Sequence, residues 1–167
     1  DEGGVEVTRY DKIHLFDVDV PDAQESYQES SVYCPGNNVV VIDSPVGKLG
    51  LAVCYDMRFP ELFRQQVAQG MQVLLIPAAF TRTTGRAHWH ALLRARAIEN
   101  LCYVAAAAQT GVHAGGRETY GHSIIYNAWG DVLGELAEEE GVVLAELDLT
   151  QQQQLRTQFP ALKNRRL

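Results

Sequence analysis

Residues 48–62 read KLGLAVCYDMRFPEL, an apolar run that ends in a turn and then meets a proline. The apolar part, Lys48–Cys54, is rich in residues that favour a buried strand. Pro60 suits the first turn of a helix, which we expect to continue to about Gln69. A strand, a turn and a helix therefore meet around Cys54, as in a fold built from alternating strands and helices.

The rest of the chain predicts further alternation. The turn residues 44–47 join Lys48–Cys54 to an earlier apolar run, Val39–Asp43, in a hairpin. A helix is predicted at Ala87–Asn100, with Trp89, Leu93 and Ala97 on one face. The remaining predicted elements are strands at Val73–Ile76, Leu101–Ala108, His122–Tyr126, Val132–Leu136 and Val142–Leu147, a loop at Pro77–Arg86, and a helix start at Gln151–Gln154. The expected fold class is α/β with a mixed sheet.

The beginning of the chain predicts an incomplete domain. Val5–Tyr10 alternates apolar and polar residues in the manner of a half-buried strand, yet no earlier strand is present to pair with it. We therefore expect the N-terminal part of the domain to be missing. Ile13–Asn38 is polar and rich in Pro and Gly, and a loop of that length inside a compact domain is usually functional.

Composition indicates one globular domain over residues 1–167. The chain is 46% hydrophobic and 21% charged, with a net charge of −7. An acidic excess disfavours nucleic acid as a partner, and the apolar runs are too short to cross a membrane. Three cysteines are an odd number for a disulfide framework. A reducing, cytoplasmic location fits this usage.

Two residues stand out as candidates for chemistry. Cys54 lies where a strand ends before a helix, and backbone N–H groups together with the helix dipole favour the reactive thiolate there. The alternative is a buried cysteine that only fills the core. Lys12 beside such a thiol would favour thiolate and hold an oxyanion. The alternative for Lys12 is a solvated lysine at a strand end.

The histidines do not indicate a metal or a specific catalytic base. His88 and His90 are two residues apart on a predicted helix, so they point in different directions and cannot bind a metal together. A Cys–His hydrolase is possible in principle, but no histidine is singled out. The chain also lacks a glycine-rich phosphate loop. No cofactor and no metal are therefore predicted.

Three stretches together resemble a known family. Residues 9–17 read RYDKIHLFD, residues 50–62 read GLAVCYDMRFPEL and residues 121–123 read GHS. They resemble the nitrilase superfamily of carbon–nitrogen hydrolases, and within it the Nit-type amidases, with a likeness that extends over nearly the whole chain. The resemblance implies an αββα sandwich of mixed sheets, a homodimer and chemistry without a cofactor.

The resemblance also implies roles for individual residues. Cys54 would be the nucleophile, Lys12 and the backbone N–H of Tyr55 would hold the oxyanion, and Glu29 would be a second catalytic glutamate. The general-base glutamate of the family would lie before Asp1 and has no counterpart here. The residues expected to bind substrate are Arg58, Ala79, Phe80, Thr84 and His88. Arg58 suits a substrate carboxylate, although an ion pair with Asp56 or Glu61 is an equal alternative.

The implied reaction is hydrolysis of a carbon–nitrogen bond in a small carboxylate-bearing amide. Deaminated glutathione and the ω-amide of an α-keto acid are the substrates that the resemblance suggests, with a cysteine thioester intermediate and release of ammonia. A hypothesis of another class is a non-catalytic binding or scaffolding fragment, because the general base is absent. Neither hypothesis involves a nucleic acid or a membrane.

Overall fold

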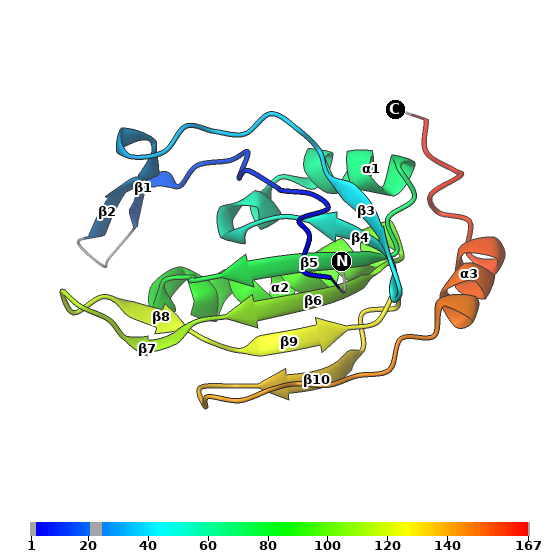
Figure 1. The fold of residues 1–167 in the computed structure, drawn as a ribbon. Coiled ribbons are helices and arrows are strands. Elements are labelled where there is room, and N and C mark those ends of the chain that lie inside the picture. Colours follow the sequence, from blue (N-terminus) through cyan, green and yellow to red (C-terminus); the bar gives the residue numbers. More distant parts are fainter. Residues whose placement is uncertain (1–2, 21–24, 167) are drawn as a thin grey trace.

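The computed structural model describes residues 3–20 and 25–166, which are built around one six-stranded sheet (Figure 1). The inner strands β4, β5 and β6 run parallel, whereas the outer pairs are antiparallel. The spatial order is β10 (Val132–Leu136), β9 (Ser123–Tyr126), β6 (Tyr103–Ala108), β5 (Val73–Ala78), β4 (Gly47–Leu51) and β3 (Val41–Ser44). The predicted mixed α/β fold is confirmed.

Three α-helices accompany the sheet in the described part of the chain. α1 (Pro60–Ala68) begins with its proline in the first turn, as predicted. α2 (Arg82–Asn100) packs with α1 on one face of the sheet, and α3 (Leu149–Gln158) lies beside the amino ends of β5 and β6 (Figure 1). None of the helices in the described residues has the length and apolar character that a membrane span requires.

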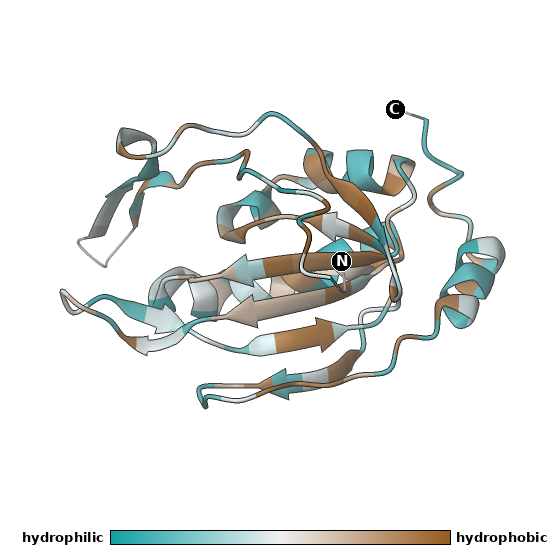
Figure 2. Ribbon diagram, viewed as in Figure 1, coloured by the Kyte–Doolittle hydropathy of each residue, from teal (hydrophilic) through white to brown (hydrophobic). Residues whose placement is uncertain are grey.

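The main core lies between the sheet and the pair α1 and α2. Leu62 and Phe63 of α1 and Trp89 and Leu93 of α2 are almost fully buried. They pack against strand residues of the same cluster, which are Leu74, Ile76, Val104, Ala106 and Ile124. Figure 2 shows the corresponding apolar colouring of β5 and β9. Alternate strand residues bury against the helices, and this period fixes the register of the sheet.

The opposite face of the sheet is less covered. Leu75, Ala105 and Ile125 are half-buried there, and Pro77 and Ala107 are exposed. The described residues form one large sheet and one layer of helices. The second pair of layers in the implied αββα sandwich does not occur among them.

Two predicted strands are absent from the described structure. Val5–Tyr10 is irregular, so its alternating pattern carries no information about a missing strand partner. Val142–Leu147 is also irregular, and the side chains of Val142 and Leu144 are exposed. Apolar alternation favours a strand only where a neighbour offers a hydrogen-bonding edge, and this segment joins no ladder.

Other boundaries differ from the prediction. α2 begins five residues before Ala87, because the Thr81 side chain accepts the N–H of Thr84 and caps the helix. The predicted loop Ile13–Asn38 contains two short paired strands and a 3₁₀ helix. These are β1 (Asp17–Val20), β2 (Glu25–Gln28) and Glu29–Ser31. A second hairpin, of β7 (Thr110–Val112) and β8 (Glu118–Tyr120), was not predicted either.

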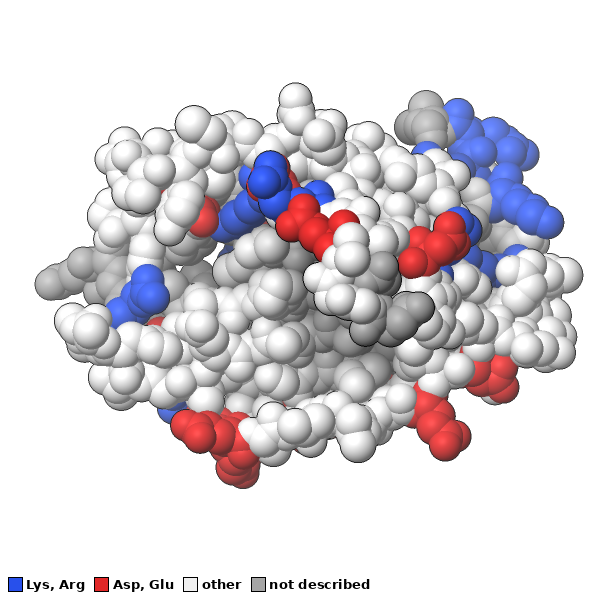
Figure 3. All heavy atoms as spheres, in the orientation of Figure 1, with Lys and Arg blue, Asp and Glu red and all other residues white. Residues whose placement is uncertain are grey.

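Charged side chains lie in separate small groups on the face in Figure 3, with a basic group at the C-terminal end. This end contains Lys163, Arg165 and Arg166. The pattern on this face offers no broad basic surface of the kind that binds a phosphate backbone.

Candidate active site

Cys54 begins a tight turn at the carboxyl end of β4. The strand ends at Leu51, and residues 54–58 form a 3₁₀ helix that leads into α1. The backbone of Cys54 has a φ of +49°, in the left-handed region that non-glycine residues rarely adopt. Such backbone strain is common at functional sites, where surrounding contacts maintain it.

Asp56 supplies those contacts. Its carboxylate is fully buried and accepts the N–H of Val53 at 2.9 Å, within the turn itself. It also accepts the Tyr10 hydroxyl at 2.8 Å and both the backbone N–H and ring Nδ1 of His14, at 3.0 and 2.7 Å. Asp56 therefore joins the turn that carries Cys54 to the segment that carries Lys12.

Lys12 and Glu29 form an ion pair on the same cavity. Lys12 Nζ donates to Glu29 Oε2 at 2.5 Å, and the backbone N–H of Phe16 donates to the same oxygen at 2.6 Å. The side chains of Lys12 and Glu29 are only 14% and 26% exposed. A charge-assisted bond in such a partly desolvated place holds the ammonium in one position.

These residues share a cavity of about 840 Å³ at the carboxyl ends of the parallel strands. This edge is where ligands bind in open α/β sheets. Every residue predicted for the site lines the cavity except His88; the lining includes Lys12, Glu29, Cys54, Tyr55, Arg58, Ala79, Phe80 and Thr84. The structure thus brings together residues that lie up to 72 positions apart, between Lys12 and Thr84.

Contacts and burial have opposite effects on the pKa of the Cys54 thiol. Burial raises its pKa, whereas the N–H of Ala79, the charge of Lys12 and the N–H of Tyr55 lower it, and Glu29 raises it. The net pKa lies above the ordinary value, because desolvation outweighs the favourable contacts. The predicted donors are present and lower the pKa of Cys54 as expected, but burial outweighs them, so their contacts alone do not make the thiolate the favoured form. The thiol needs a base to become a nucleophile.

Arg58 points its guanidinium into the cavity. The guanidinium carbon lies 5.4 Å from the centre of the Phe80 ring and 5.7 Å from that of Tyr55. Arg58 Nη1 and Nη2 donate to His88 Nδ1 at 3.3 and 3.4 Å. Burial lowers the pKa of Arg58. His88 therefore contacts the guanidinium of Arg58 without lining the cavity itself, and its role in substrate binding stays a prediction.

The alternative ion pairs of Arg58 do not form. Within the described residues, neither Asp56 nor Glu61 makes an ion pair with it, since the Asp56 carboxylate is turned to Tyr10 and His14. The neighbours of the Arg58 guanidinium are the His88 ring and two aromatic faces. A guanidinium that lines a cavity without an ion pair to Asp56 or Glu61 suits a carboxylate ligand.

Sequence reasoning missed several cavity residues. Arg117, between β7 and β8, brings a second guanidinium to the lining, 6.0 Å from the Tyr27 ring centre. No local pattern identifies it, because the loop reaches the cavity only through the hairpin. Gln109 also lines the cavity. The rule that strand carboxyl ends carry function was sufficient to find Gln109, which follows β6 directly.

One group of potential metal ligands lies outside this cavity, within the part of the chain that the structure describes. Within the described residues, His90, His122 and Glu135 are the side chains that approach each other closely enough to share an ion. His90 and His88 do point in different directions, as predicted, but His90 meets a histidine from another part of the chain.

Comparisons with known proteins agree with the fold and give the family. Residues 1–157 match the family of carbon–nitrogen hydrolases. The deaminated glutathione amidase of Yersinia enterocolitica is 47% identical over 166 residues, which are 99% of this chain and 58% of that protein. The chain therefore spans a little more than half the length of this relative.

Solved structures give the same assignment. The NitFhit protein of C. elegans matches with a TM-score of 0.92 and 46% identity, over 99% of this chain and 40% of that one. A variant of the amidase from Nesterenkonia sp. AN1, with acrylamide added at its active-site cysteine, matches with a TM-score of 0.72 and 31% identity. That match covers 92% of this chain and 57% of the amidase. With the family matched over nearly all of its length, this chain belongs to the carbon–nitrogen hydrolases of the nitrilase superfamily.

Proposed function

We propose that the whole protein is an amidase that hydrolyses a carbon–nitrogen bond in a small carboxylate-bearing amide, with Cys54 as nucleophile. The observation that carries the proposal is the convergence of Cys54, Lys12 and Glu29 on one cavity. The deaminated glutathione amidases among the relatives support it.

The proposed reaction has two steps. A base removes the thiol proton of Cys54, whose sulfur attacks the amide carbonyl carbon to form a C–S bond. The ammonium of Lys12 and the N–H of Tyr55 hold the negative oxygen of the tetrahedral intermediate. The C–N bond then breaks as the leaving nitrogen takes the proton. Water, activated by the same base, hydrolyses the resulting thioester and restores the thiol.

Glu29 does not suit the role of that base. It is the only carboxylate among the described residues that line the cavity, and it already accepts hydrogen bonds from Lys12 and Phe16. We assign it the orientation of Lys12. We propose, as the family resemblance implies, that the base is a glutamate upstream of Asp1.

Arg58 and Arg117 support a substrate with carboxylate groups. Both guanidinium groups line a cavity whose volume of about 840 Å³ accommodates a small organic molecule. Deaminated glutathione and an ω-amide of an α-keto acid both fit this chemistry. Their products differ, because a primary ω-amide releases ammonia whereas the secondary amides of deaminated glutathione release an amine. The predicted ammonia therefore applies only to the ω-amide.

The experiment is a turnover assay on the protein with all upstream residues that its gene encodes. Deaminated glutathione and an α-keto acid ω-amide are supplied separately, and released amine and ammonia are measured in each. We expect turnover with at least one of them, abolished in Cys54→Ser and in Lys12→Met but kept in the matched control Cys34→Ser. Near-normal turnover in either of the first two variants would contradict the proposal.

The alternative of a non-catalytic binding fragment makes a different prediction. It is favoured by the absence of a free carboxylate from the described lining of the cavity. Under this alternative, the amide binds, Arg58→Ala weakens its binding, and no product forms even with the upstream residues present. A Cys–His hydrolase has less support, because no histidine lines the described cavity.

The resemblance also suggests a homodimer, which we retain as a proposal. Sedimentation velocity measured over a range of protein concentrations tests it, and a single monomeric species at all concentrations would exclude it.

A further inference from the structure

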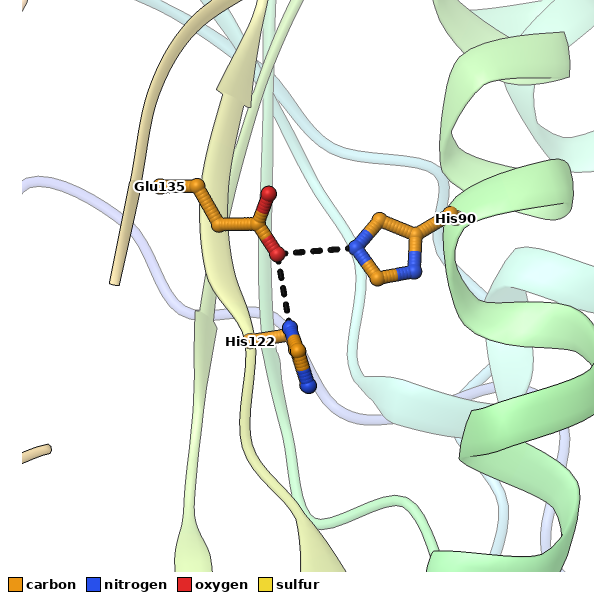
Figure 4. Close-up of side chains that lie close together, drawn as sticks. All are labelled: His90, His122 and Glu135. Atoms are coloured by element: carbon orange, nitrogen blue, oxygen red, sulfur yellow. Dashed lines mark hydrogen bonds and ion pairs between the residues drawn. The ribbon is translucent and has the colours of Figure 1, made fainter. Parts of the chain in front are cut away.

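Three side chains from distant parts of the chain converge outside the cavity. His90 comes from α2, His122 from the residue before β9, and Glu135 from β10 (Figure 4). His90 Nε2 lies 2.9 Å and His122 Nδ1 lies 2.6 Å from the same oxygen, Glu135 Oε1. None of the three lines the cavity of Cys54. The proposed amidase chemistry leaves this cluster without a role.

The backbone around the cluster is held firmly. His122 has a φ of +61°, a left-handed conformation that a histidine adopts at some energetic cost. Its N–H donates to Ala137 O at 2.6 Å, and its carbonyl accepts the indole N–H of Trp89 at 2.7 Å. Trp89 is fully buried and precedes His90 directly on α2. The strained position of His122 and the position of His90 are thus fixed by the same core residue.

The rings are positioned as well as the backbone. The His122 ring stacks on Tyr120 with 4.2 Å between centres, and it meets the His90 ring edge to face at 5.1 Å. Glu135 lies on β10 opposite Ile124 of β9. A site whose donors are held by regular elements and packed rings loses little conformational freedom when it binds a ligand.

The donor set matches the chemistry of a transition metal. Two imidazole nitrogens and one carboxylate are common ligands of Zn²⁺, whereas Mg²⁺ and Ca²⁺ prefer oxygen alone. One potential ligand atom from each residue lies within 4.8 Å of the others. Ligands of a tetrahedral Zn²⁺ lie roughly 3.4 Å apart. The two distances from Glu135 Oε1 to the histidine nitrogens, 2.9 and 2.6 Å, would each lengthen by less than about 1 Å to reach that spacing.

Access and proton balance also allow a metal. The side chains of His90, His122 and Glu135 are 37%, 19% and 32% exposed, which leaves a direction open for a water ligand. Either nitrogen of an imidazole ring can present a lone pair, so the ring nitrogens that face Glu135 can serve as metal ligands.

We propose that His90, His122 and Glu135 form a structural binding site for a divalent transition-metal ion of the Zn²⁺ type. The ion links α2, the start of β9 and β10. His122 is followed by Ser123, which lines the cavity and accepts the N–H of Ala108 at 2.9 Å. The metal thereby stabilises one wall of the cavity without contacting Cys54.

The test is a calorimetric titration of Zn²⁺ into the metal-free full chain, prepared with a chelator that is then removed. Cys34 and Cys54 are replaced by serine in every sample, because accessible thiols also bind Zn²⁺. We expect one ion per chain, a rise in Tm with Zn²⁺, and a visible Co²⁺ spectrum typical of tetrahedral nitrogen and oxygen ligands.

Two variants and a control locate the ion. Glu135→Gln keeps an oxygen that accepts from both histidines but loses the charge, and His90→Gln replaces a partly exposed side chain. Each is expected to weaken Zn²⁺ binding at least about tenfold. The control His88→Gln lies two residues from His90 on the same helix and leaves binding unchanged.

The proposal is overturned if the parent chain shows no saturable one-to-one binding. It is also overturned if Zn²⁺ binds equally well to Glu135→Gln and His90→Gln. In the first case the three residues form only a hydrogen-bonded cluster. Far-ultraviolet circular dichroism confirms that each variant is folded, and the two variants disturb the fold in different ways, so a loss shared by both reports on the metal ligands.

Discussion

Cys54 and Cys102 lie at opposite ends of the central parallel strands, and the surroundings of the two thiols differ. Cys54 follows β4 and faces the cavity, with Lys12 and two backbone N–H groups lowering its pKa against the effect of burial. Cys102 precedes β6 and has no exposed surface. Burial raises the pKa of Cys102 to about 12, and its thiol donates to the carbonyl of Arg96 at 3.7 Å.

The amino end of the strands is closed by α3. Gln152 Nε2 donates to the carbonyls of Gln72 and Leu101, at 2.8 and 3.1 Å. Arg156 donates to the carbonyls of Leu101 and Met71, at 2.9 and 2.8 Å. These bonds satisfy backbone oxygens at that end of the sheet. The carboxyl end of the strands has the cavity instead. We call the amino end, which α3 covers, the structural end of the sheet, and the carboxyl end, which carries the candidate site, its chemical end.

The largest expected effect separates the two cysteines directly. In the protein with its upstream residues, Cys54→Ala should lower amide turnover at least about 1000-fold, because no other nucleophile can form the thioester. Cys102→Ala should keep turnover within about twofold and lower the free energy of unfolding by about 1 kcal/mol, since it leaves a small cavity in the core. Product release and urea unfolding measure the two effects. Equal losses of turnover in both variants would remove the distinction.

Two lysines, Lys12 and Lys48, allow the same comparison between the two ends of the strands. Lys12→Met should lower kcat/KM by about 100-fold or more, because it removes a charged donor to the oxyanion. The matched control is Lys48→Met, at the amino end of β4, where the lysine pairs with the exposed Asp43. This control should change kcat/KM by less than about twofold, since an exposed ion pair contributes little. Steady-state kinetics give kcat/KM for both variants. A large loss of kcat/KM in Lys48→Met would indicate that replacing a lysine affects the fold in general.

Arg156→Ala tests the structural end. It removes the donor to the carbonyls of Leu101 and Met71, so the free energy of unfolding should fall by about 2 kcal/mol. Turnover per folded molecule should stay the same. Urea unfolding gives the first quantity and kinetics below the transition give the second. An unchanged unfolding midpoint would show that water replaces the guanidinium without cost.

The parts of the fold with local signals were predictable from sequence. Pro60 placed the start of α1, and the β10 prediction Val132–Leu136 matches the structure. The first turn of α2 was missed because Thr83, Thr84 and Gly85 have weak helix propensity. The cap depends on a single side chain, that of Thr81. Val142–Leu147 has the composition of a strand without a ladder to join.

The candidate site also has features that were predictable from sequence and features that were not. The motifs around Cys54 and Lys12 identified both residues, and Glu29 followed from the resemblance. The net pKa of Cys54 depends on burial, which no motif encodes. Arg117 comes to the cavity through the pairing of β7 and β8, and pairings between distant segments have no local sequence signal.

The most direct test of the central claim, that Lys12, Glu29 and Cys54 act as one electrostatic site, is the rate of Cys54 alkylation as a function of pH. Alkylation follows the thiolate, so its midpoint reports the pKa of Cys54. An ordinary thiol has its midpoint at about pH 8.5. We expect the midpoint of Cys54 to lie above that value, because burial raises its pKa. Removal of the positive charge in Lys12→Met should move the midpoint up, and removal of the negative charge in Glu29→Gln should move it down. A midpoint that is the same in the parent chain and both variants would contradict the account.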